Sequence, residues 1–526
     1  MKTLFFILLT SLTSQICGQP TIKWQKSFGG SEFEFPGSLI LNRNGGFTIA
    51  GSSNSQDGQV NGLHVGSCSF GICQDYWVVN TDSLGNLLWE KCFGGTGDDA
   101  AYSIASTGDG GSIICGYTTS LDGDVTGIHT GFSAMDVWVV RLDSSGNLLW
   151  QRCLGGSRGE FGFSIISTID KGFVIAAYAN SYDGDVPGNN NPNQSSDVWV
   201  IKLDSFGSTV WSQIYGGPGD DWPSSIIQTY DSGYAFLGWS AGAGGQVTGY
   251  HSARDYWLGK IDKSGVFQWG RCYGGSDFDE GYDIKQTPDS GFILTGRTLS
   301  HDGDVTANLD TSAFESWTIK TDKNGNIEWV KTLGGTAYDQ GASILILSDS
   351  SFLLSCTSQS NDRDVSGNNG GDDIFLAILN FNGQVLWNRC FGGPGQENAR
   401  SMIEIGNKDL CMVAESSYNG GDVSGNHGYG DYWLVRLNEA STSVPNNSPI
   451  QPLEIFPNPF DNSISIKFKG SMEGNLKVLD MIGNIVFEID DFNSRSINLS
   501  FLSTGIYFVN FTNKSGFSSQ KIVKIN

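Results

Sequence analysis

Short apolar runs separated by turn signals follow one another along most of the chain. One stretch carries four of these runs, at 102–107 (YSIAST), 111–117 (GSIICGY), 137–143 (VWVVRLD) and 147–153 (NLLWQRC). The last two are joined by Ser-Ser-Gly-Asn, in which glycine can supply the positive φ of a β-hairpin. The pattern predicts four short strands in this unit.

The four-strand unit recurs at a nearly constant period. Its last run, NLLWQRCLGG at 147–156, has a counterpart with tryptophan and Gly-Gly every 58 to 65 residues, and the tryptophans are Trp24, Trp89, Trp150, Trp211, Trp269, Trp329 and Trp387. Such a period indicates a repeat architecture, and four strands per repeat are typical of the blades of a β-propeller. We therefore predict an all-β fold with a seven-bladed propeller over residues 19–439.

The two ends of the repeat region are offset from each other. The motif of the third strand, Asp-x-Trp in most copies, occurs for the last time at 431–435, and no tryptophan run follows it. The missing strand is present at 22–28 (IKWQKSF), near the start of the chain. We predict that this N-terminal strand completes the last blade, which would remove an exposed sheet edge.

The charge of the chain narrows the classes of partner. Its formal net charge is -24, with 31 basic against 55 acidic residues, so the basic surface that binds nucleic acid is not expected.

Residues 1–18 have the layout of a secretory signal peptide cleaved before Gln19, and no other segment is apolar enough for a transmembrane helix. Lipid attachment at Cys17 is an alternative that Ile16 disfavours. We predict an exported protein.

Six of the ten cysteines fall into two groups. Cys68 and Cys73 lie close together in a loop and form the best candidate disulfide, with two free thiols as the alternative. Cys92, Cys153, Cys272 and Cys390 each follow a repeat tryptophan by three residues. Equivalent positions in successive repeats lie apart, so we expect these four to be small buried apolar residues.

Pairs of aspartates recur in the loop before the third strand, in the pattern Asp-Gly-Asp-Val. The clearest copies contain Asp122 and Asp124, Asp183 and Asp185, and Asp302 and Asp304. Propeller topology places this loop on the same face as the Gly-Gly loops, so one face should be densely acidic. The aspartates are candidate Ca²⁺ ligands, and the alternative is that they form ordinary turns.

Four histidines occupy one register of the repeat: His64, His129, His251 and His427. This recurrence favours a repeated packing or hydrogen-bonding role over a catalytic centre. The sequence shows no nucleophile or zinc-protease motif and no phosphate-binding loop, and we assign no catalytic residue. The fourth repeat departs most from the others, with Trp222 and Pro223 in DDWPSS, so a unique pocket is expected there.

The end of the chain has a different character. Residues 440–452 are rich in Ser, Pro and Asn and read as a linker, and short alternating runs from 453 to 526 predict a small β-sandwich of the Ig-like kind. This segment resembles the C-terminal sorting domain, type A, of type IX secretion cargo of Bacteroidota. The matching residues are Pro457, Asn458, Pro459, Asp480, Gly483, Leu502, Gly505, Tyr507, Lys521 and Lys524.

The resemblance implies a route of export and two partners. It implies that the C-terminal domain engages the type IX translocon and a sortase-like peptidase, which would attach the protein to the outer-membrane surface. The repeats are also similar to those of secreted Bacteroidota propellers. Our main hypothesis is a non-enzymatic propeller for adhesion or for binding polysaccharide or a surface protein. The alternatives are a polysaccharide hydrolase or lyase and a purely structural coat protein.

Overall fold

The computed structural model describes residues 20–66, 73–131, 135–188, 195–306, 313–406, 409–438, 454–467, 474–479, 485–492, 496–513 and 516–525. Within these residues the structure is all-β and has no α-helix. The chain divides into two compact units, of which one is Gln19–Ala440 and the other includes Ser441–Asn526. The predicted signal peptide and linker lie outside the described residues.

The first unit is built from antiparallel sheets of four strands. Within the described residues there are seven of them. They are β2 (Glu34–Leu41), β3 (Phe47–Ser53), β4 (Asp75–Thr81) and β5 (Leu87–Phe93); β6 (Asp99–Ser106), β7 (Ser112–Thr118), β8 (Asp136–Leu142) and β9 (Leu148–Leu154); β10 (Glu160–Ser167), β11 (Phe173–Ala179), β12 (Asp197–Leu203) and β13 (Thr209–Tyr215); β14 (Asp221–Gln228), β15 (Tyr234–Ser240), β16 (Asp255–Ile261) and β17 (Phe267–Tyr273); β18 (Asp279–Gln286), β19 (Phe292–Thr298), β20 (Glu315–Thr321) and β21 (Ile327–Leu333); β22 (Asp339–Ile346), β23 (Phe352–Ser358), β24 (Asp373–Leu379) and β25 (Val385–Phe391); and β26 (Glu397–Ile405), β27 (Asp409–Ser416), β28 (Asp431–Leu437) and β1 (Ile22–Phe28).

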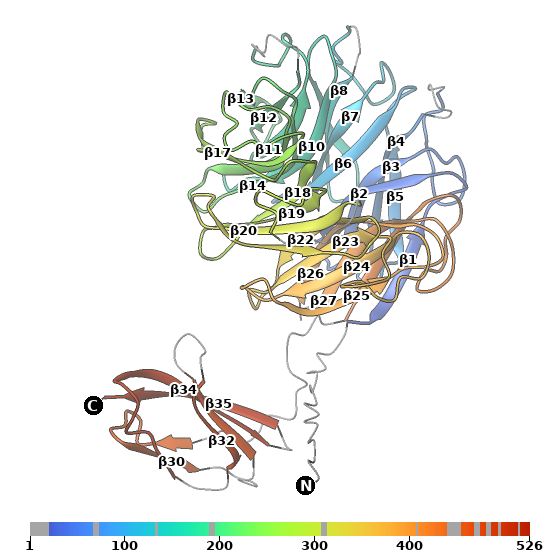
Figure 1. The fold of residues 1–526 in the computed structure, drawn as a ribbon. Helices are drawn as coiled ribbons and strands as arrows, with labels where there is room; N and C mark the ends of the chain where they lie inside the picture. The colour runs from blue at the N-terminus through green and yellow to red at the C-terminus, as the bar shows by residue number, and fades with distance from the viewer. Residues whose placement is uncertain are drawn as a thin grey trace, which may run out of the picture. The chain divides into compact units, whose positions relative to one another are not determined.

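The sheets follow one another around a common axis (Figure 1). The first strand of each sheet contacts the first strand of the next, in the closed order β2, β6, β10, β14, β18, β22, β26 and back to β2. This arrangement is propeller-like, with the first strands innermost. We call this unit the ring.

The N-terminal strand closes the ring. β1 pairs with β28 in antiparallel register, with Trp24 opposite Arg436 and Phe28 opposite Tyr432. Phe28 is only 2% exposed and packs in a cluster with residues of β3, β4, β27 and β28. The last sheet is thus assembled from the two ends of the repeat region, as the offset in the sequence predicted.

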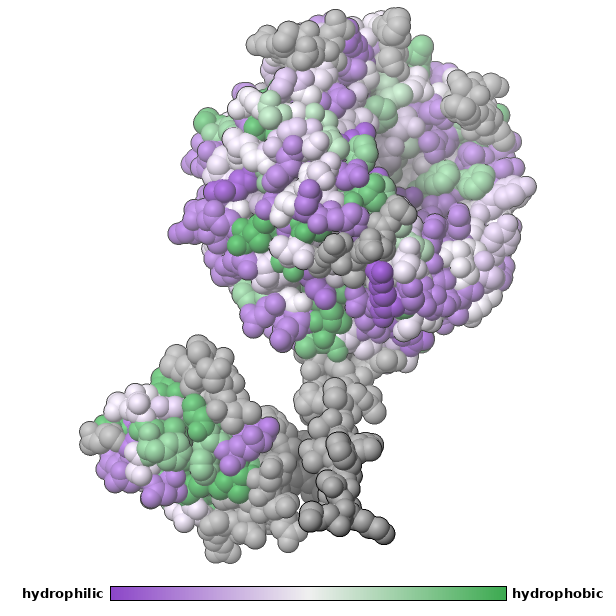
Figure 2. Space-filling model, in the orientation of Figure 1, coloured by the Kyte–Doolittle hydropathy of each residue, from purple (hydrophilic) through white to green (hydrophobic). Residues whose placement is uncertain are grey.

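Hydrophobic packing between neighbouring sheets holds the ring together. The third-strand tryptophans Trp77, Trp138, Trp199, Trp257, Trp317 and Trp433 are fully buried. They serve the core, so none of them is available to stack on a sugar. Cys153, Cys272 and Cys390 are buried free thiols and Cys92 is partly buried, as expected for small apolar core residues. Figure 2 shows a mostly hydrophilic visible face on the ring.

The second unit contains two small sheets. One consists of β29 (Glu454–Phe456), β30 (Ser463–Lys467) and β33 (Ser496–Asn498), and the other of β32 (Ile485–Phe492), β31 (Gly474–Leu479), β34 (Gly505–Asn513) and β35 (Gly516–Lys524). A single cluster of buried side chains, including Phe460, Leu476 and Val509, packs between them. The unit is a small all-β domain.

Candidate functional site

The recurrent Gly-Gly and acidic residues form a buried frame between neighbouring sheets. Gly95 donates its backbone N–H to the carboxylate of Asp99, which begins the next innermost strand, over 2.9 Å. Gly94 lies against Asp99 and Asp75, because a Cβ built on it would come within 2.5 Å and 2.7 Å of their carboxylate oxygens. Glycine is therefore required at this position. Equivalent donor–acceptor pairs are Gly30–Glu34, Gly156–Glu160, Gly217–Asp221, Gly275–Asp279, Gly335–Asp339 and Gly393–Glu397.

Each frame brings two buried carboxylates close together, one from the third strand of a sheet and one from the first strand of the next. Burial raises the pKa of Asp75 to about 6 and that of Asp99 to about 7, and the charge of Asp75 adds to the effect at Asp99. Burial also raises the pKa of Glu34, Glu160, Asp221 and Glu397 to about 7. These acids repeat around the ring and belong to its internal packing.

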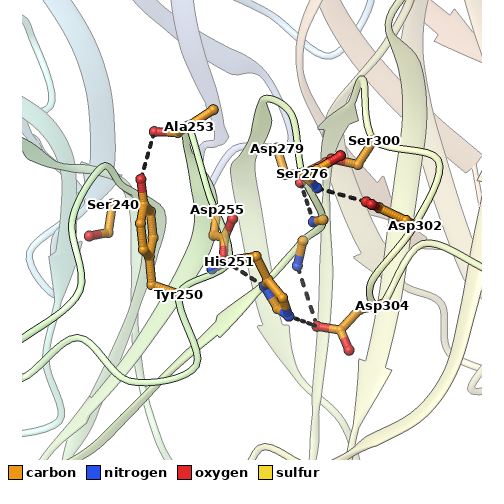
Figure 3. A network of polar contacts seen from close by, with 12 residues as sticks. Ser240, Tyr250, His251, Ala253, Asp255, Ser276, Asp279, Ser300, Asp302 and Asp304 are labelled. Carbon is orange, nitrogen blue, oxygen red and sulfur yellow. Dashed lines mark hydrogen bonds and ion pairs between the residues drawn. The ribbon is translucent and has the colours of Figure 1, made fainter.

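The four repeated histidines join this frame. His251 donates its backbone N–H and directs Nδ1 to the buried Asp255, at 2.7 Å and 2.8 Å, and its Nε2 lies 4.0 Å from Asp304 of the next sheet (Figure 3). His64, His129 and His427 make the same contacts with the aspartate that begins their third strand. A repeated hydrogen-bonding role for these histidines is confirmed.

The candidate Ca²⁺ ligands are engaged with backbone groups. Asp122, Asp183 and Asp302 each accept a hydrogen bond of 2.7 Å from the backbone N–H that follows a Gly-Gly pair. Asp124, Asp185 and Asp304 lie 3.3–3.4 Å from the N–H of the first glycine of the pair. In the part of the chain that the structure describes, no group of three or more His, Cys, Asp or Glu side chains could hold a metal ion. The contacts support the turn interpretation, and Ca²⁺ binding stays a prediction.

Only one cysteine of the predicted disulfide lies among the described residues. Cys73 is buried and disulfide-bonded. Cys68 lies outside the described residues, so the pairing stays a prediction.

A pocket of about 730 Å³ lies at the end of the central channel, and it is lined by residues of the innermost strands. In each innermost strand a β-bulge falls at the fourth residue, as between Ala101 and Ser103 in β6. The seven bulge residues, Gly37, Tyr102, Phe163, Ser224, Tyr282, Ala342 and Arg400, all line the pocket. A bulge residue is not paired in the sheet, and its side chain points in a different direction from those of its neighbours. The seven bulge positions therefore give the pocket a lining whose residue types vary, although the strands that carry them are alike. We call this site the channel-mouth pocket.

One side of the channel-mouth pocket is an arc of aromatic rings. Tyr102 stacks on Phe163 with centroids 5.4 Å apart, and Phe163 lies 5.8 Å from Trp222. Trp222 in turn stacks on Trp239 at 5.4 Å. Tyr102 is 37% exposed and lines the pocket, so part of its side chain is accessible there.

The other side of the channel-mouth pocket carries charged groups. Glu280 accepts a hydrogen bond from Arg254 and bonds of 3.0 Å and 2.5 Å from Nε and Nη2 of Arg297. Burial raises the pKa of Glu280, but the charge of Arg297 and the bond from Arg254 outweigh it and hold the pKa below its usual value. Arg254 also lies over the ring of Trp239 at 4.1 Å, which joins the charged side to the aromatic arc.

The sequence located part of this pocket. Trp222 and Pro223 of the divergent fourth repeat line it, although all seven innermost strands contribute to the lining and the pocket is not unique to that repeat. Tyr102, Arg254, Arg297 and the other lining residues were missed, because no motif marks them. The available signal was variation at the seven bulge residues, Tyr102 among them, which occupy one register of the repeat where the side chain changes from copy to copy. Arg254, before β16, and Arg297, on β19, lie in other registers.

The sorting-domain residues come together in the second unit. The Asn458 side chain donates to the Lys521 carbonyl over 2.8 Å and accepts from the Val523 N–H at 2.9 Å. Lys524 donates to the Asp461 carbonyl and lies over the ring of Phe460 at 5.7 Å. The Pro-Asn-Pro segment and the last strand thus form one structural element. Tyr507 is buried and donates to the Ser503 carbonyl. Asp480 and Gly483 lie outside the described residues.

Comparison with known families identifies this second unit. Residues 454–526 match the model of the "Secretion system C-terminal sorting domain". The chain therefore carries a type IX secretion sorting domain, as its motifs indicated, and this domain implies export by the type IX system of Bacteroidota. No α-helix in the described residues could cross a membrane, because none is present there.

Solved structures resemble the chain only distantly. A protein of unknown function from Dyadobacter fermentans has 11% identity and a TM-score of 0.41, over 80% of this chain and 99% of that one. A protein of unknown function from Bacteroides caccae has 9% identity and a TM-score of 0.35, over 62% and 93%. Sqt1 from Chaetomium thermophilum has 11% identity and a TM-score of 0.40, over 79% and 100%. At such scores these likenesses carry no information about function. No curated protein matches the sequence.

Proposed function

We propose that this chain is an exported, non-enzymatic carbohydrate-binding protein. In this proposal the ring is a seven-bladed β-propeller that binds glycan at the channel-mouth pocket, and the C-terminal unit is an Ig-like sorting domain. The observation that carries the proposal is the aromatic arc of Tyr102, Phe163, Trp222 and Trp239 on the wall of a pocket of about 730 Å³.

The chemistry of the channel-mouth pocket suits a sugar. Small-molecule sites are concave, mainly apolar or aromatic, and contain a few well-placed polar groups, and their volumes span about 300–1,000 Å³. The exposed face of Tyr102 offers an apolar platform for the C–H face of a pyranose. Gln74 and Gln340 line the same pocket and offer amide donors and acceptors for hydroxyl groups.

The position of this pocket among the innermost strands favours recognition at one site over multivalent adhesion. The uniform residues of the repeats, including the buried acids and the third-strand tryptophans, are used inside the ring. The residues that vary line one central site. In the mature protein, after removal of the signal peptide at residues 1–18, attachment to the outer-membrane surface by the sortase-like peptidase would display this site to the medium.

The hydrolase form of the polysaccharide-degrading alternative finds less support, whereas the lyase form stays a prediction. Glycoside hydrolysis generally needs two carboxyl groups, one of which is a proton donor with a raised pKa. Among the described residues that line the channel-mouth pocket, Glu280 supplies the one carboxylate. Two arginines hold its pKa low, so it stays charged and is a poor proton donor.

The test is calorimetric titration of the chain from residue 19 onward with a panel of neutral and acidic oligosaccharides. We expect at least one to bind and Tyr102→Ala to weaken that binding at least about tenfold through loss of the stacking face. Tyr230→Ala is the matched control, since Tyr230 is 66% exposed and does not line the pocket. Equal affinities for the two variants would refute glycan binding at this site, and product release from a polysaccharide would restore the enzyme alternative.

A further inference from the structure

The channel-mouth pocket is positively charged in a strongly acidic protein. Its lining contains Arg254, Arg297 and Arg400 and one carboxylate, Glu280, so three positive charges stand against one negative charge. The chain as a whole has a net charge of -24. A positively charged pocket in a negatively charged protein is explained if the pocket binds an anionic ligand.

The three arginines differ in their remaining hydrogen-bonding capacity. Arg297 is committed to the protein, because Nε and Nη2 donate to Glu280 while Nη1 donates to Tyr338 and Gln340 over 2.8 Å and 3.1 Å. Its role is to hold the wall of the pocket. It leaves Arg254 and Arg400 as the groups that can meet a ligand.

Arg254 has N–H donors that remain available to a ligand. Its Nη1 donates to Glu280, and no hydrogen bond of its Nε or Nη2 is formed within the described residues. The side chain is 38% exposed and lies against the ring of Trp239. A guanidinium held flat on an aromatic ring is pre-organised, so less conformational entropy is lost when its free edge binds a planar anion.

Arg400 is the second available cation. Its side chain is 43% exposed, and its one hydrogen bond among the described residues is a 3.4 Å bond from Nη2 to Glu415. It occupies the bulge position of β26, and the next two bulge positions around the ring hold Gly37 and Tyr102. Gly37 has no side chain, so the bulge position of β2 places no side chain between Arg400 and Tyr102. The charge of Arg400 acts on Tyr102, where it opposes the increase in pKa that burial causes.

We propose that the channel-mouth pocket selects an acidic sugar, a uronate residue, whose ring stacks on Tyr102 and whose carboxylate binds Arg400, with Arg254 available to a second uronate at the other end of the aromatic arc. The proposal rests on the function proposed above and names its ligand class. Arginine and carboxylate form bidentate hydrogen bonds with charge assistance, and the accessible ring of Tyr102, on which the charge of Arg400 acts, favours a sugar over an extended peptide.

The experiment compares matched ligands by calorimetry on the chain from residue 19 onward. The acidic ligands are oligomers of galacturonate, glucuronate and alginate uronates, the neutral ones are their methyl esters, and sulfated galactan oligomers and a peptide with a free C-terminus test other anions. We expect at least one acidic oligomer to bind at least about tenfold more tightly than its ester. Arg400→Gln should remove most of this difference by weakening binding of the acid far more than binding of the ester.

Arg271→Gln is the matched control, because Arg271 lies on β17 outside the pocket and donates to the Asn324 carbonyl. Thermal unfolding checks that each variant is folded. Acid and ester that bind equally, or an Arg400→Gln variant that weakens both equally, would overturn the uronate assignment while glycan binding stands. Binding of the sulfated oligomer or the peptide in place of every uronate would also overturn it. If no glycan binds, or if Tyr102→Ala changes nothing, the proposed function itself fails.

Discussion

Replacing Glu397 by glutamine tests the buried carboxylate frame. Glu397 is fully buried, accepts hydrogen bonds from the Gly393 N–H at 2.7 Å and the Ser416 hydroxyl at 3.1 Å, and lies beside the buried Asp373. Burial, more than the charge of Asp373, raises the pKa of Glu397 from 4.5 to about 7. No histidine contacts this pair among the described residues, so its titration is simpler than that of the other frames.

The sign of the effect follows from linkage. The folded chain holds a proton on Glu397 that the unfolded chain releases, so the wild type loses stability as pH rises from about 4.5 to about 7. One pKa unit corresponds to about 1.4 kcal/mol, so the loss is at most about 3 kcal/mol. Glutamine cannot ionise and its amide can still accept from Gly393 and donate to Ser416. Glu397→Gln should therefore match the wild type near pH 4.5 and exceed it by up to about 3 kcal/mol at pH 8.

The assay is urea unfolding at a series of pH values, followed by tryptophan fluorescence. All 15 tryptophans lie between residues 24 and 433, so the signal reports on the ring. Glu404→Gln, the same substitution on the same strand at a partly exposed position, is the control and should run parallel to the wild type. If Glu397→Gln also runs parallel to the wild type across this range, the buried frame does not carry the raised proton affinity.

Three further predictions concern the frame, ring closure and metal binding. Gly94→Ala should lower the free energy of unfolding by about 1–3 kcal/mol, since its Cβ would press on two buried carboxylates, whereas Gly108→Ala, with nothing within 4 Å, should have little effect in urea unfolding. Phe28→Ala should cost about 3–5 kcal/mol in the same assay by leaving a cavity between β1 and its neighbours, and the 83% exposed Phe206 is the control; equal losses would contradict closure by β1. Thermal unfolding in excess Ca²⁺ and in excess chelator should give coincident curves if the Asp-Gly-Asp loops are turns, and a higher midpoint in Ca²⁺ would establish metal binding.

The sequence alone was sufficient for the repeat, the strands and the offset of β1. These features depend on local rules: alternating apolar positions, glycine in turns and a period near 60 residues. The sorting domain could also be recognised from the sequence, because Pro457, Asn458 and Pro459 form a short motif and the other motifs of the domain follow it in a fixed order. Patterns of this kind can be recognised in the sequence because each depends on residues that are close together along the chain.

Tertiary structure decided what the repeated and variable residues do. Only the contacts between sheets showed that the Gly-Gly pairs and the acidic residues that begin the strands form a buried frame, to which the histidines hydrogen-bond. The aspartates of the Asp-Gly-Asp loops hydrogen-bond to the Gly-Gly segments, and Ca²⁺ binding by them stays a prediction. The channel-mouth pocket depends even more on the fold, because Tyr102 and Arg400 are separated by nearly 300 residues and meet only when β1 closes the ring and brings β26 beside β2. Spacing along the chain cannot reveal a site that closure of the ring creates.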